Sequence, residues 1–185
     1  MYILIVLLVV LASVLVVLYN RLIRSRNRVD TAWSDVDVQL QRRHDLVPRL
    51  VSSVDAYAKY ERATLEAIAE LRSEAMRVTD LDARGKAEEQ LSTSVQKLIA
   101  LAESYPDLKA NENFLNLQNE LVETENYLQF ARRYYNGSVR DYNTMTETVP
   151  SNIVAGMFNF DARSFFQKSS DDAANVPLVN LGSVE

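Results

Sequence analysis

The sequence predicts an all-α membrane protein, in which an N-terminal transmembrane helix is followed by an antiparallel up-and-down helical bundle of three long helices and a short fourth. Three observations lead to this prediction. An apolar run opens the chain, apolar residues then recur at intervals of three, four and seven, and the 185 residues include only four glycines and four prolines. The sequence gives no sign of strands.

Residues 1–19 are the predicted anchor. The run from Tyr2 to Leu18 is apolar except for Ser13. At about 1.5 Å per residue it spans about 26 Å, slightly less than the ~30 Å of a hydrocarbon core. Because no Lys or Arg precedes the run and no small-residue cleavage site follows it, we expect the segment to stay attached rather than to be cleaved as a signal peptide.

A basic collar at residues 20–29 gives the expected orientation. Its arginines follow the anchor at once, whereas no basic side chain precedes it. This bias places the N-terminus outside and the C-terminal domain in the cytoplasm. Generic contact with anionic headgroups is favoured over a site for one particular lipid. The residues expected at the membrane interface are Tyr19, Arg21, Arg24, Arg26 and Arg28.

The helical bundle is predicted to occupy residues 30–167. Its first helix is expected to reach about Thr79, because one apolar stripe continues through Ala58, Leu65 and Ile68. Pro48 lacks a backbone donor, so a kink or a join is expected between Arg43 and Pro48. The sequence leaves open whether this helix is continuous with the anchor.

Two more long helices complete the predicted bundle. The second begins after the capping residue Asp80 and stops at Pro106. The third extends from there to about Thr148, since its apolar stripe passes through Asn136-Gly137 without a change of phase.

The C-terminal part of the chain is predicted to be less regular. A short apolar helix and a loop are expected between Ile153 and Phe166. Residues 168–185 are polar and acidic and show no periodicity, which predicts a disordered tail.

The composition excludes several functional classes. The chain has no cysteine and one histidine, which excludes thiol chemistry, disulfides and the usual zinc and haem sites. The formal net charge of −5 divides into +4 on the collar and −9 on residues 29–185. So acidic a domain is unsuited to nucleic acid. We expect no cofactor, no metal and no small-molecule substrate.

Short runs spread along the chain carry a family resemblance. In the first half they are Tyr19-Asn20-Arg21, Ala32-Trp33-Ser34, Asp37-Val38-Gln39-Leu40 and Arg42 to Pro48. In the second half they are Asn111 to Leu115 with Leu117-Gln118, Thr124-Glu125-Asn126, Phe130-Ala131-Arg132, Tyr142-Asn143 and Pro150 to Phe158. In this order they resemble the signature runs of the LemA family of bacterial membrane proteins, over roughly residues 19–166.

The resemblance implies an anchored helical bundle in the bacterial cell (inner) membrane, in a family without an established enzymatic activity. The chain departs from the family pattern at a few positions. Arg49 stands where asparagine is frequent, Gly137 where a non-glycine residue is usual, Val149 where phenylalanine is common and Asn159 where glycine is common. Of these, Gly137 puts the straightness of the third helix in question.

Two groups of residues could carry chemistry, and each has a simpler interpretation. His44 to Pro48 superficially resembles the phosphoacceptor box of sensor histidine kinases, but the proline is one residue too close and the chain has no ATP-binding domain. We favour a polar residue near the kink. The glutamates of the third helix could hold two iron ions only with Glu-x-x-His pairs, which are missing, so Glu112, Glu120, Glu123 and Glu125 are expected to form a solvated face.

The residues most suited to a partner are apolar and aromatic. Docking of residues 153–166 onto the end of the bundle is favoured, whereas exposure there would indicate a partner surface, self-association or membrane contact. Tyr135 and Tyr142 lie on the apolar stripe and are expected in the core. The candidate partner surface consists of Ile153, Met157, Phe158, Phe160, Phe165 and Phe166, together with Tyr127 and Tyr134.

These observations favour a non-enzymatic, membrane-anchored structural or interaction protein that self-associates or scaffolds other membrane proteins. The expected partners are the lipid bilayer, further copies of the chain and a membrane protein. The alternative is an adaptor that presents clients to a membrane protease or signalling complex. An enzyme is disfavoured, because the sequence shows no set of nucleophile, base and oxyanion donor.

Overall fold

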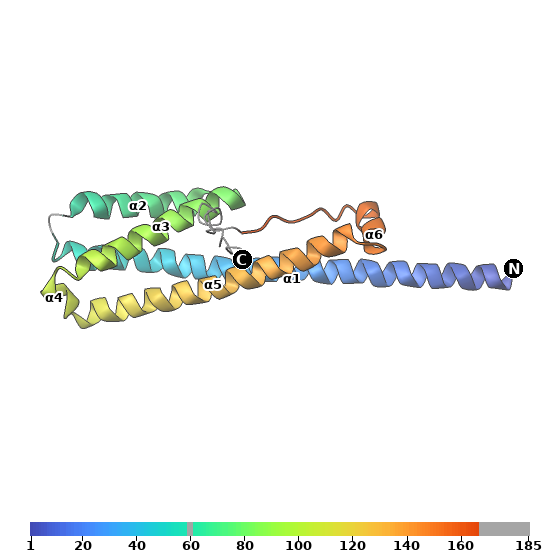
Figure 1. The fold of residues 1–185 in the computed structure, drawn as a ribbon, viewed down its shortest axis with the longest axis horizontal. Coiled ribbons are helices and arrows are strands. Elements are labelled where there is room, and N and C mark those ends of the chain that lie inside the picture. Colours follow the sequence, from blue (N-terminus) through green and yellow to red (C-terminus); the bar gives the residue numbers. More distant parts are fainter. Residues whose placement is uncertain (59–60, 167–185) are drawn as a thin grey trace, which may run out of the picture.

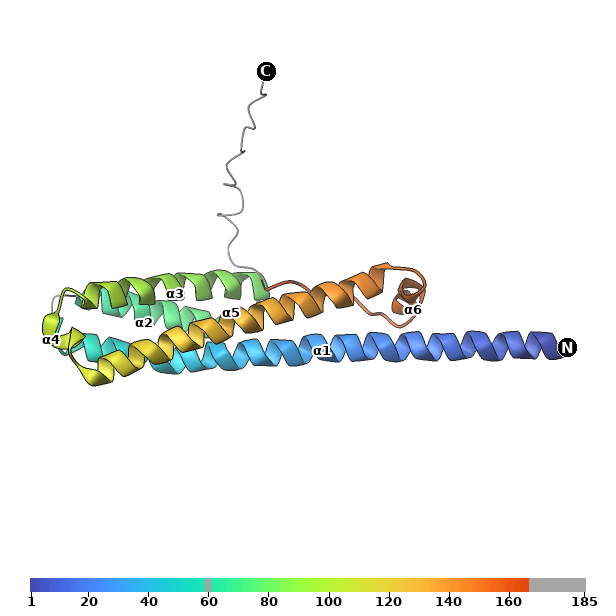
Figure 2. The same ribbon diagram turned by 60° about the horizontal axis from the view of Figure 1, so that its bottom comes forward.

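The computed structural model describes residues 1–58 and 61–166. In these residues the chain forms helices only, namely α1 (Tyr2–Asp55), α2 (Arg62–Arg77), α3 (Leu81–Ala102), α4 (Pro106–Lys109), α5 (Glu112–Glu147) and α6 (Ser151–Met157). α1 and α3 run in one direction and α2 and α5 return (Figure 1). Seen from a second side, the N-terminal part of α1 again projects beyond the other helices (Figure 2). The all-helical prediction is confirmed, although the described residues form six helices, whereas an anchor helix, three long bundle helices and a short fourth were expected.

α1 joins the anchor to the bundle without a break. Pro48 lies inside this helix, which continues to Asp55, so the predicted join near Pro48 is wrong. The missing amide proton of Pro48 leaves the His44 carbonyl without its helical donor. Arg72 on α2 donates to this carbonyl instead, with an Nε–O distance of 2.6 Å. A side chain of the neighbouring helix thus supplies the bond that proline removes.

The first bundle helix is shorter than predicted. α1 ends at Asp55 and α2 runs back from Arg62, whereas one helix was expected to reach about Thr79. Ala58 and Leu65, on opposite sides of the reversal, are both buried in the same core. The apolar residues on the two sides of the turn therefore keep a helix-like spacing of seven, so the periodicity of the sequence does not reveal the turn.

The other long helices follow most of the predicted boundaries, but the short helix α4 separates Pro106 from the start of α5 at Glu112, where the third helix was expected to follow Pro106 directly. The Asp80 carboxylate accepts a hydrogen bond from the Ala83 amide at 2.9 Å and caps α3. The Asn111 side chain caps α5 by accepting from the amides of Asn113 and Phe114. α5 then passes through Gly137 and ends at Glu147, as its unbroken stripe predicted.

The core of the bundle has two apolar halves. The half distant from the anchor includes Leu50, Leu91 and Leu117. The half near the anchor includes Leu22 and Leu128, together with Tyr135 and Tyr142, which confirms the prediction for these tyrosines. The buried polar residues Arg43, His44, Glu88 and Thr124 lie between the two halves along the helices.

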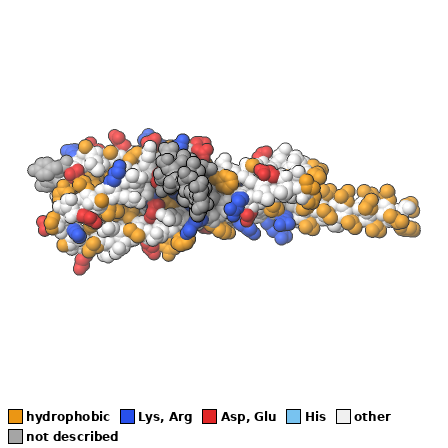
Figure 3. Space-filling view, viewed as in Figure 1, with side chains coloured by type: hydrophobic (Ala, Val, Ile, Leu, Met, Phe, Trp, Pro, Cys, Tyr) orange, Lys and Arg blue, Asp and Glu red, His pale blue; other side chains and the backbone are white. Residues whose placement is uncertain are grey.

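The projecting part of α1 has the properties of a membrane span. By length and composition it is apolar enough to cross a bilayer, and no residue of its apolar window is buried inside the described part of the protein. Hydrophobic side chains cover the surface of this projecting helix in the space-filling view (Figure 3). The predicted tail, residues 168–185, lies outside the described residues.

Candidate functional site

A buried layer of charged side chains connects three helices at the middle of the bundle. Arg43 on α1 forms an ion pair with Glu88 on α3, and both side chains are almost fully buried. Arg43 also contacts Glu125 on α5, with 3.0 Å between Nη1 and Oε2. His44 Nε2 lies 2.9 Å from the other carboxylate oxygen of Glu88. One buried carboxylate therefore holds two consecutive residues of α1.

The electrostatics of this layer follow from burial and pairing. Burial by itself would raise the pKa of Glu88, but the interactions with His44 and Arg43 outweigh it and hold this pKa below its usual value. Burial and the charge of Arg43 lower the pKa of Arg132, which approaches the layer from α5. Glu88 is thus ionised at neutral pH and acts as a fixed acceptor.

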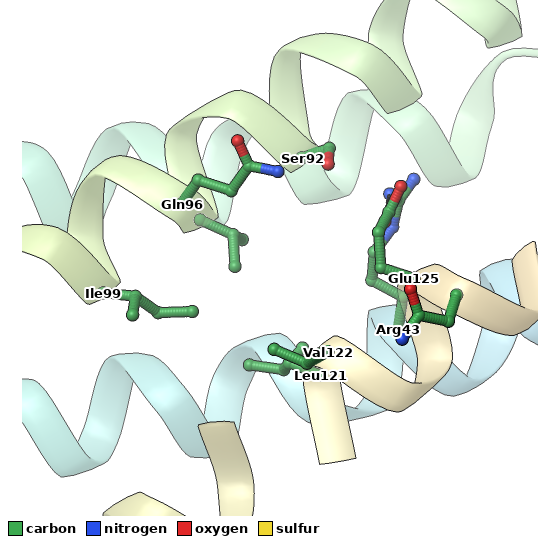
Figure 4. A pocket seen from close by; sticks show the side chains of 9 residues that line it. Arg43, Ser92, Gln96, Ile99, Leu121, Val122 and Glu125 are labelled. Carbon is green, nitrogen blue, oxygen red and sulfur yellow. Dashed lines mark hydrogen bonds and ion pairs between the residues drawn. The ribbon is translucent and has the colours of Figure 1, made fainter. Parts of the chain in front are cut away.

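A groove of about 210 Å³ opens beside this layer, between α3 and α5. Its polar end is formed by Arg43 and Glu125, and Ser92 and Gln96 of α3 face Leu121 and Val122 of α5 across it (Figure 4). Most of its lining is apolar. The volume of the groove is smaller than the roughly 300–1,000 Å³ of typical small-molecule sites.

The structure changes the interpretation of the charged residues. His44 is buried against Glu88 and is not open to a phosphoryl donor. The expected solvated face of glutamates is wrong for Glu125, which pairs with Arg43, while Glu120 and Glu123 form exposed ion pairs with Arg49 and Arg42. Among the described residues, no group of His, Asp and Glu side chains is placed to hold a metal ion.

The predicted interface residues gather where α1 leaves the bundle. The arginines at 21, 24 and 28 line a groove of about 560 Å³ with Ser25 of α1 and Asp141, Thr144 and Met145 of α5. Arg26 instead turns to the protein and lies over the ring of Phe160, with 5.5 Å to its centroid. Tyr19 makes edge-on contacts with Phe158 and Phe160 at 4.8 and 5.7 Å between ring centroids. The end of the anchor is therefore packed against the C-terminal segment.

Two asparagines of α5 bind the extended segment that follows α6. The Asn143 side chain accepts from the amide and donates to the carbonyl of Arg163, both at 2.9 Å. The Asn136 side chain makes the same pair of bonds with Phe166, at 2.9 and 3.0 Å. Seven residues apart on one helix face, these amides pair with the segment as a neighbouring strand would. Sequence reasoning missed this role, for which the only signal was a repeated asparagine at helical spacing.

The candidate partner surface divides into a buried and an exposed part. Phe160 and Phe166 are buried, and Phe166 packs edge-on against Trp33, so these two side chains do not belong to an open surface. Phe165 is partly buried. Asn159, with a φ of 55°, turns the chain after α6 in a conformation that asparagine and glycine adopt most readily. Ile153, Met157 and Phe158 remain exposed.

An exposed aromatic groove runs along α5 beside α1. Tyr127, Phe130 and Tyr134 project from one face of α5 and are each at least half exposed. With Val38 of α1 they line a groove of about 340 Å³, which also contains Asp35, Gln39 and Ala131. The guanidinium of Arg133 lies 4.7 Å from the ring centroid of Phe130. We call this feature the aromatic groove; sequence reasoning found the two tyrosines and missed Phe130 and Val38.

Comparisons with known proteins identify a family and several relatives. The LemA family matches residues 32–181. Protein LemA of Metamycoplasma hominis is 27% identical over 164 residues, which cover 88% of this chain and 74% of that protein. Magnetosome protein MamQ 2 of Paramagnetospirillum magneticum is 22% identical over 90% of this chain and 70% of its own length. Magnetosome protein MamQ of Magnetospirillum gryphiswaldense is 21% identical, over 93% and 72%. None of these names denotes an enzyme.

Proposed function

The chain belongs to the LemA family, and from this premise we propose that it is a non-catalytic scaffold of the bacterial inner membrane whose copies associate side by side through the aromatic groove. The observation that carries the proposal is the exposure of Tyr127, Phe130 and Tyr134 on one helix face, next to Val38. Clustered exposed aromatic side chains are typical of association surfaces and are unfavourable in contact with water.

The direction of the groove suits a second copy of the same chain. The groove lies between α5 and α1, and α1 is one continuous helix with the anchor (Figure 1). Two anchors that cross one bilayer in the same direction therefore place their grooves at the same distance from the membrane. Asp35 lies in the groove and Arg133 lies at its edge over Phe130. Opposite charges on one patch allow a two-fold pair in which each acid meets the base of the other copy.

The size of the groove makes this association depend on the membrane. A fully buried aromatic side chain covers roughly 150–250 Å². With three half-exposed rings and one valine, we expect each copy to bury about 400 Å², or roughly 800 Å² in a pair, below the ~1,200 Å² of stable soluble interfaces. The anchors confine the copies to one plane and one orientation, which raises their effective concentration and compensates for the small area.

Single cysteines provide a clean test, because the natural chain has none. A Tyr134→Cys variant in native membranes, treated with a short bismaleimide, is expected to give a dimer of the chain. Met76→Cys on α2, which is also exposed, is the matched control and should stay monomeric. Adding Phe130→Ser should weaken the Tyr134→Cys cross-link. A monomer at Tyr134→Cys, with a monomeric mass in lipid nanodiscs, would refute self-association, and a cross-link to a different protein would favour the adaptor.

The proposed orientation has the bundle in the cytoplasm. It is supported by the arginines at 21, 24 and 28, which remain exposed where α1 leaves the bundle. A membrane-impermeant maleimide should label Met76→Cys only after the inner membrane is opened. Labelling in intact spheroplasts would reverse this topology.

A further inference from the structure

Four large apolar side chains are exposed on α6 and its flanks. Val149, Ile153, Met157 and Phe158 are 76%, 59%, 63% and 53% exposed. We propose that this α6 patch is a second membrane-contact element, which lies in the interfacial layer of the bilayer beside the anchor and takes lipid as its partner. The proposal depends on the membrane anchor and not on self-association.

The opposite side of α6 is fixed to the protein. Val154 and Ala155 are buried in the membrane-proximal core, where Leu15, Leu18 and Tyr19 of the anchor also pack. Phe158 contacts the ring of Tyr19 at 4.8 Å between centroids. The position of the patch relative to the anchor is therefore set by packing, and the patch cannot turn its apolar side chains into the bundle.

The position of α6 along α1 gives the depth of the patch. At about 1.5 Å per residue, the contacts from Leu15 to Tyr19 cover about 6 Å at the inner end of the apolar run. Amphipathic elements that lie in a membrane interface bury their apolar face by about 5–10 Å. If the run from Tyr2 to Leu18 crosses the hydrocarbon layer, α6 lies at its boundary with the headgroups.

The charges around α6 agree with this position. Residues 148–160 include no Asp, Glu, Lys or Arg. Arg21, Arg24 and Arg28 follow the anchor on the side of the bundle and line an open groove with α5. Apolar side chains at the boundary and arginines directly behind them match the order of acyl chains and anionic headgroups.

The surface of the patch is continuous with the surface of the anchor. Hydrophobic side chains extend from the projecting part of α1 onto the adjoining end of the bundle, with basic side chains next to them (Figure 3). A protein partner that covered the patch would also have to replace lipid around Tyr19. In the proposed arrangement lipid surrounds the anchor at this depth, so the same lipid removes the side chains of the patch from contact with water and no further partner is needed.

Depth-dependent fluorescence quenching of the full chain tests the proposal. Met157→Cys carries an environment-sensitive dye, and the protein is reconstituted in vesicles of phosphatidylcholine and phosphatidylglycerol. We expect lipids with a nitroxide near the headgroup to quench most of the fluorescence, lipids with a nitroxide deep in the acyl chain to quench less, and aqueous iodide to have little effect. A second label at Ile153→Cys should behave in the same way.

Leu115→Cys at the far end of α5 is the matched control, because this apolar side chain is also exposed. Its label should be quenched by iodide and not by the lipids. The unfolding midpoint of each labelled variant should equal that of the unlabelled chain. Quenching of the Met157→Cys label by iodide alone would overturn the proposal, because the patch would face water. Protection from both quenchers would also overturn it, because protein would then cover the patch.

Discussion

Replacing Arg72 tests how α1 remains continuous across Pro48. Arg72→Met removes the side-chain donor that the structure gives to the His44 carbonyl, at 2.6 Å, while it keeps a side chain of similar length. A hydrogen bond from a charged donor contributes about 1.5–3 kcal/mol, and an unsatisfied, partly buried carbonyl adds a desolvation cost. We therefore expect Arg72→Met to lower the free energy of unfolding by about 2 kcal/mol.

A second substitution separates this bond from other effects of Arg72. Pro48→Ala restores an amide donor to the His44 carbonyl within α1. In this background the carbonyl no longer depends on Arg72, so Arg72→Met should cost less than about 1 kcal/mol. The coupling between the two positions isolates the bond that replaces the proline amide.

Thermal unfolding of the full chain in a mild detergent, followed by circular dichroism at the helix band, measures each step of the cycle. For a chain of this length a loss of about 2 kcal/mol corresponds to a fall of roughly 4–8 °C in Tm. Arg62→Met is the control, because the Arg62 side chain is 83% exposed and forms only a surface pair with Glu66. An equal cost of Arg72→Met with and without the Pro48→Ala substitution would refute the compensation.

Three further predictions concern the buried layer, the α5 glycine and the asparagines. The pKa of Glu88 is lowered in the folded chain, so the stabilisation by its carboxylate is present above the unfolded pKa of about 4.3 and is lost as pH falls through the folded pKa. Glu88→Gln removes this titration and should reduce the fall in Tm between about pH 5 and pH 3. An unchanged fall in Tm would contradict this. Gly137→Ala should stabilise α5 by about 0.5–1 kcal/mol, because the added Cβ meets no atom within 4 Å, and a lower Tm would show that α5 needs the glycine. Asn143→Leu should release the backbone of Arg163 and speed tryptic cleavage after this residue. Asn126→Leu, at an exposed position of the same helix, is the control and should not change the cleavage rate. Equal cleavage rates in the two variants would argue against the asparagine contacts.

The long helices were predictable because their signals are local. Asp80 caps α3 within one turn, and the stripe of α5 continues through Gly137 in phase. The reversal after Asp55 was not predictable, because no glycine or proline marks it and the stripe of α2 continues that of α1. Pro48 gave a misleading signal, since the donor that compensates for it, Arg72, lies 28 residues away from His44 in sequence.

The candidate sites were predictable only in part, for a related reason. The tyrosines at 127 and 134 are exposed as expected, because helical phase alone separates them from Tyr135. The roles of Glu88 and of the asparagines depend on partners from other helices, which one sequence does not specify. Glu88 in particular looks like any surface glutamate until α3 is placed against Arg43.

Because α1 is unbroken, a tilt of its membrane-spanning part also tilts its bundle part. From Tyr19 to Asp55 the helix extends for about 54 Å at about 1.5 Å per residue. Spanning helices adjust their inclination to the thickness of the bilayer, and a tilt of about 20° is ordinary. With no hinge between anchor and bundle, such a tilt moves the far tip of the bundle sideways by about 18 Å. In the proposed topology, a change of tilt in a bilayer of different thickness would therefore displace the cytoplasmic tip.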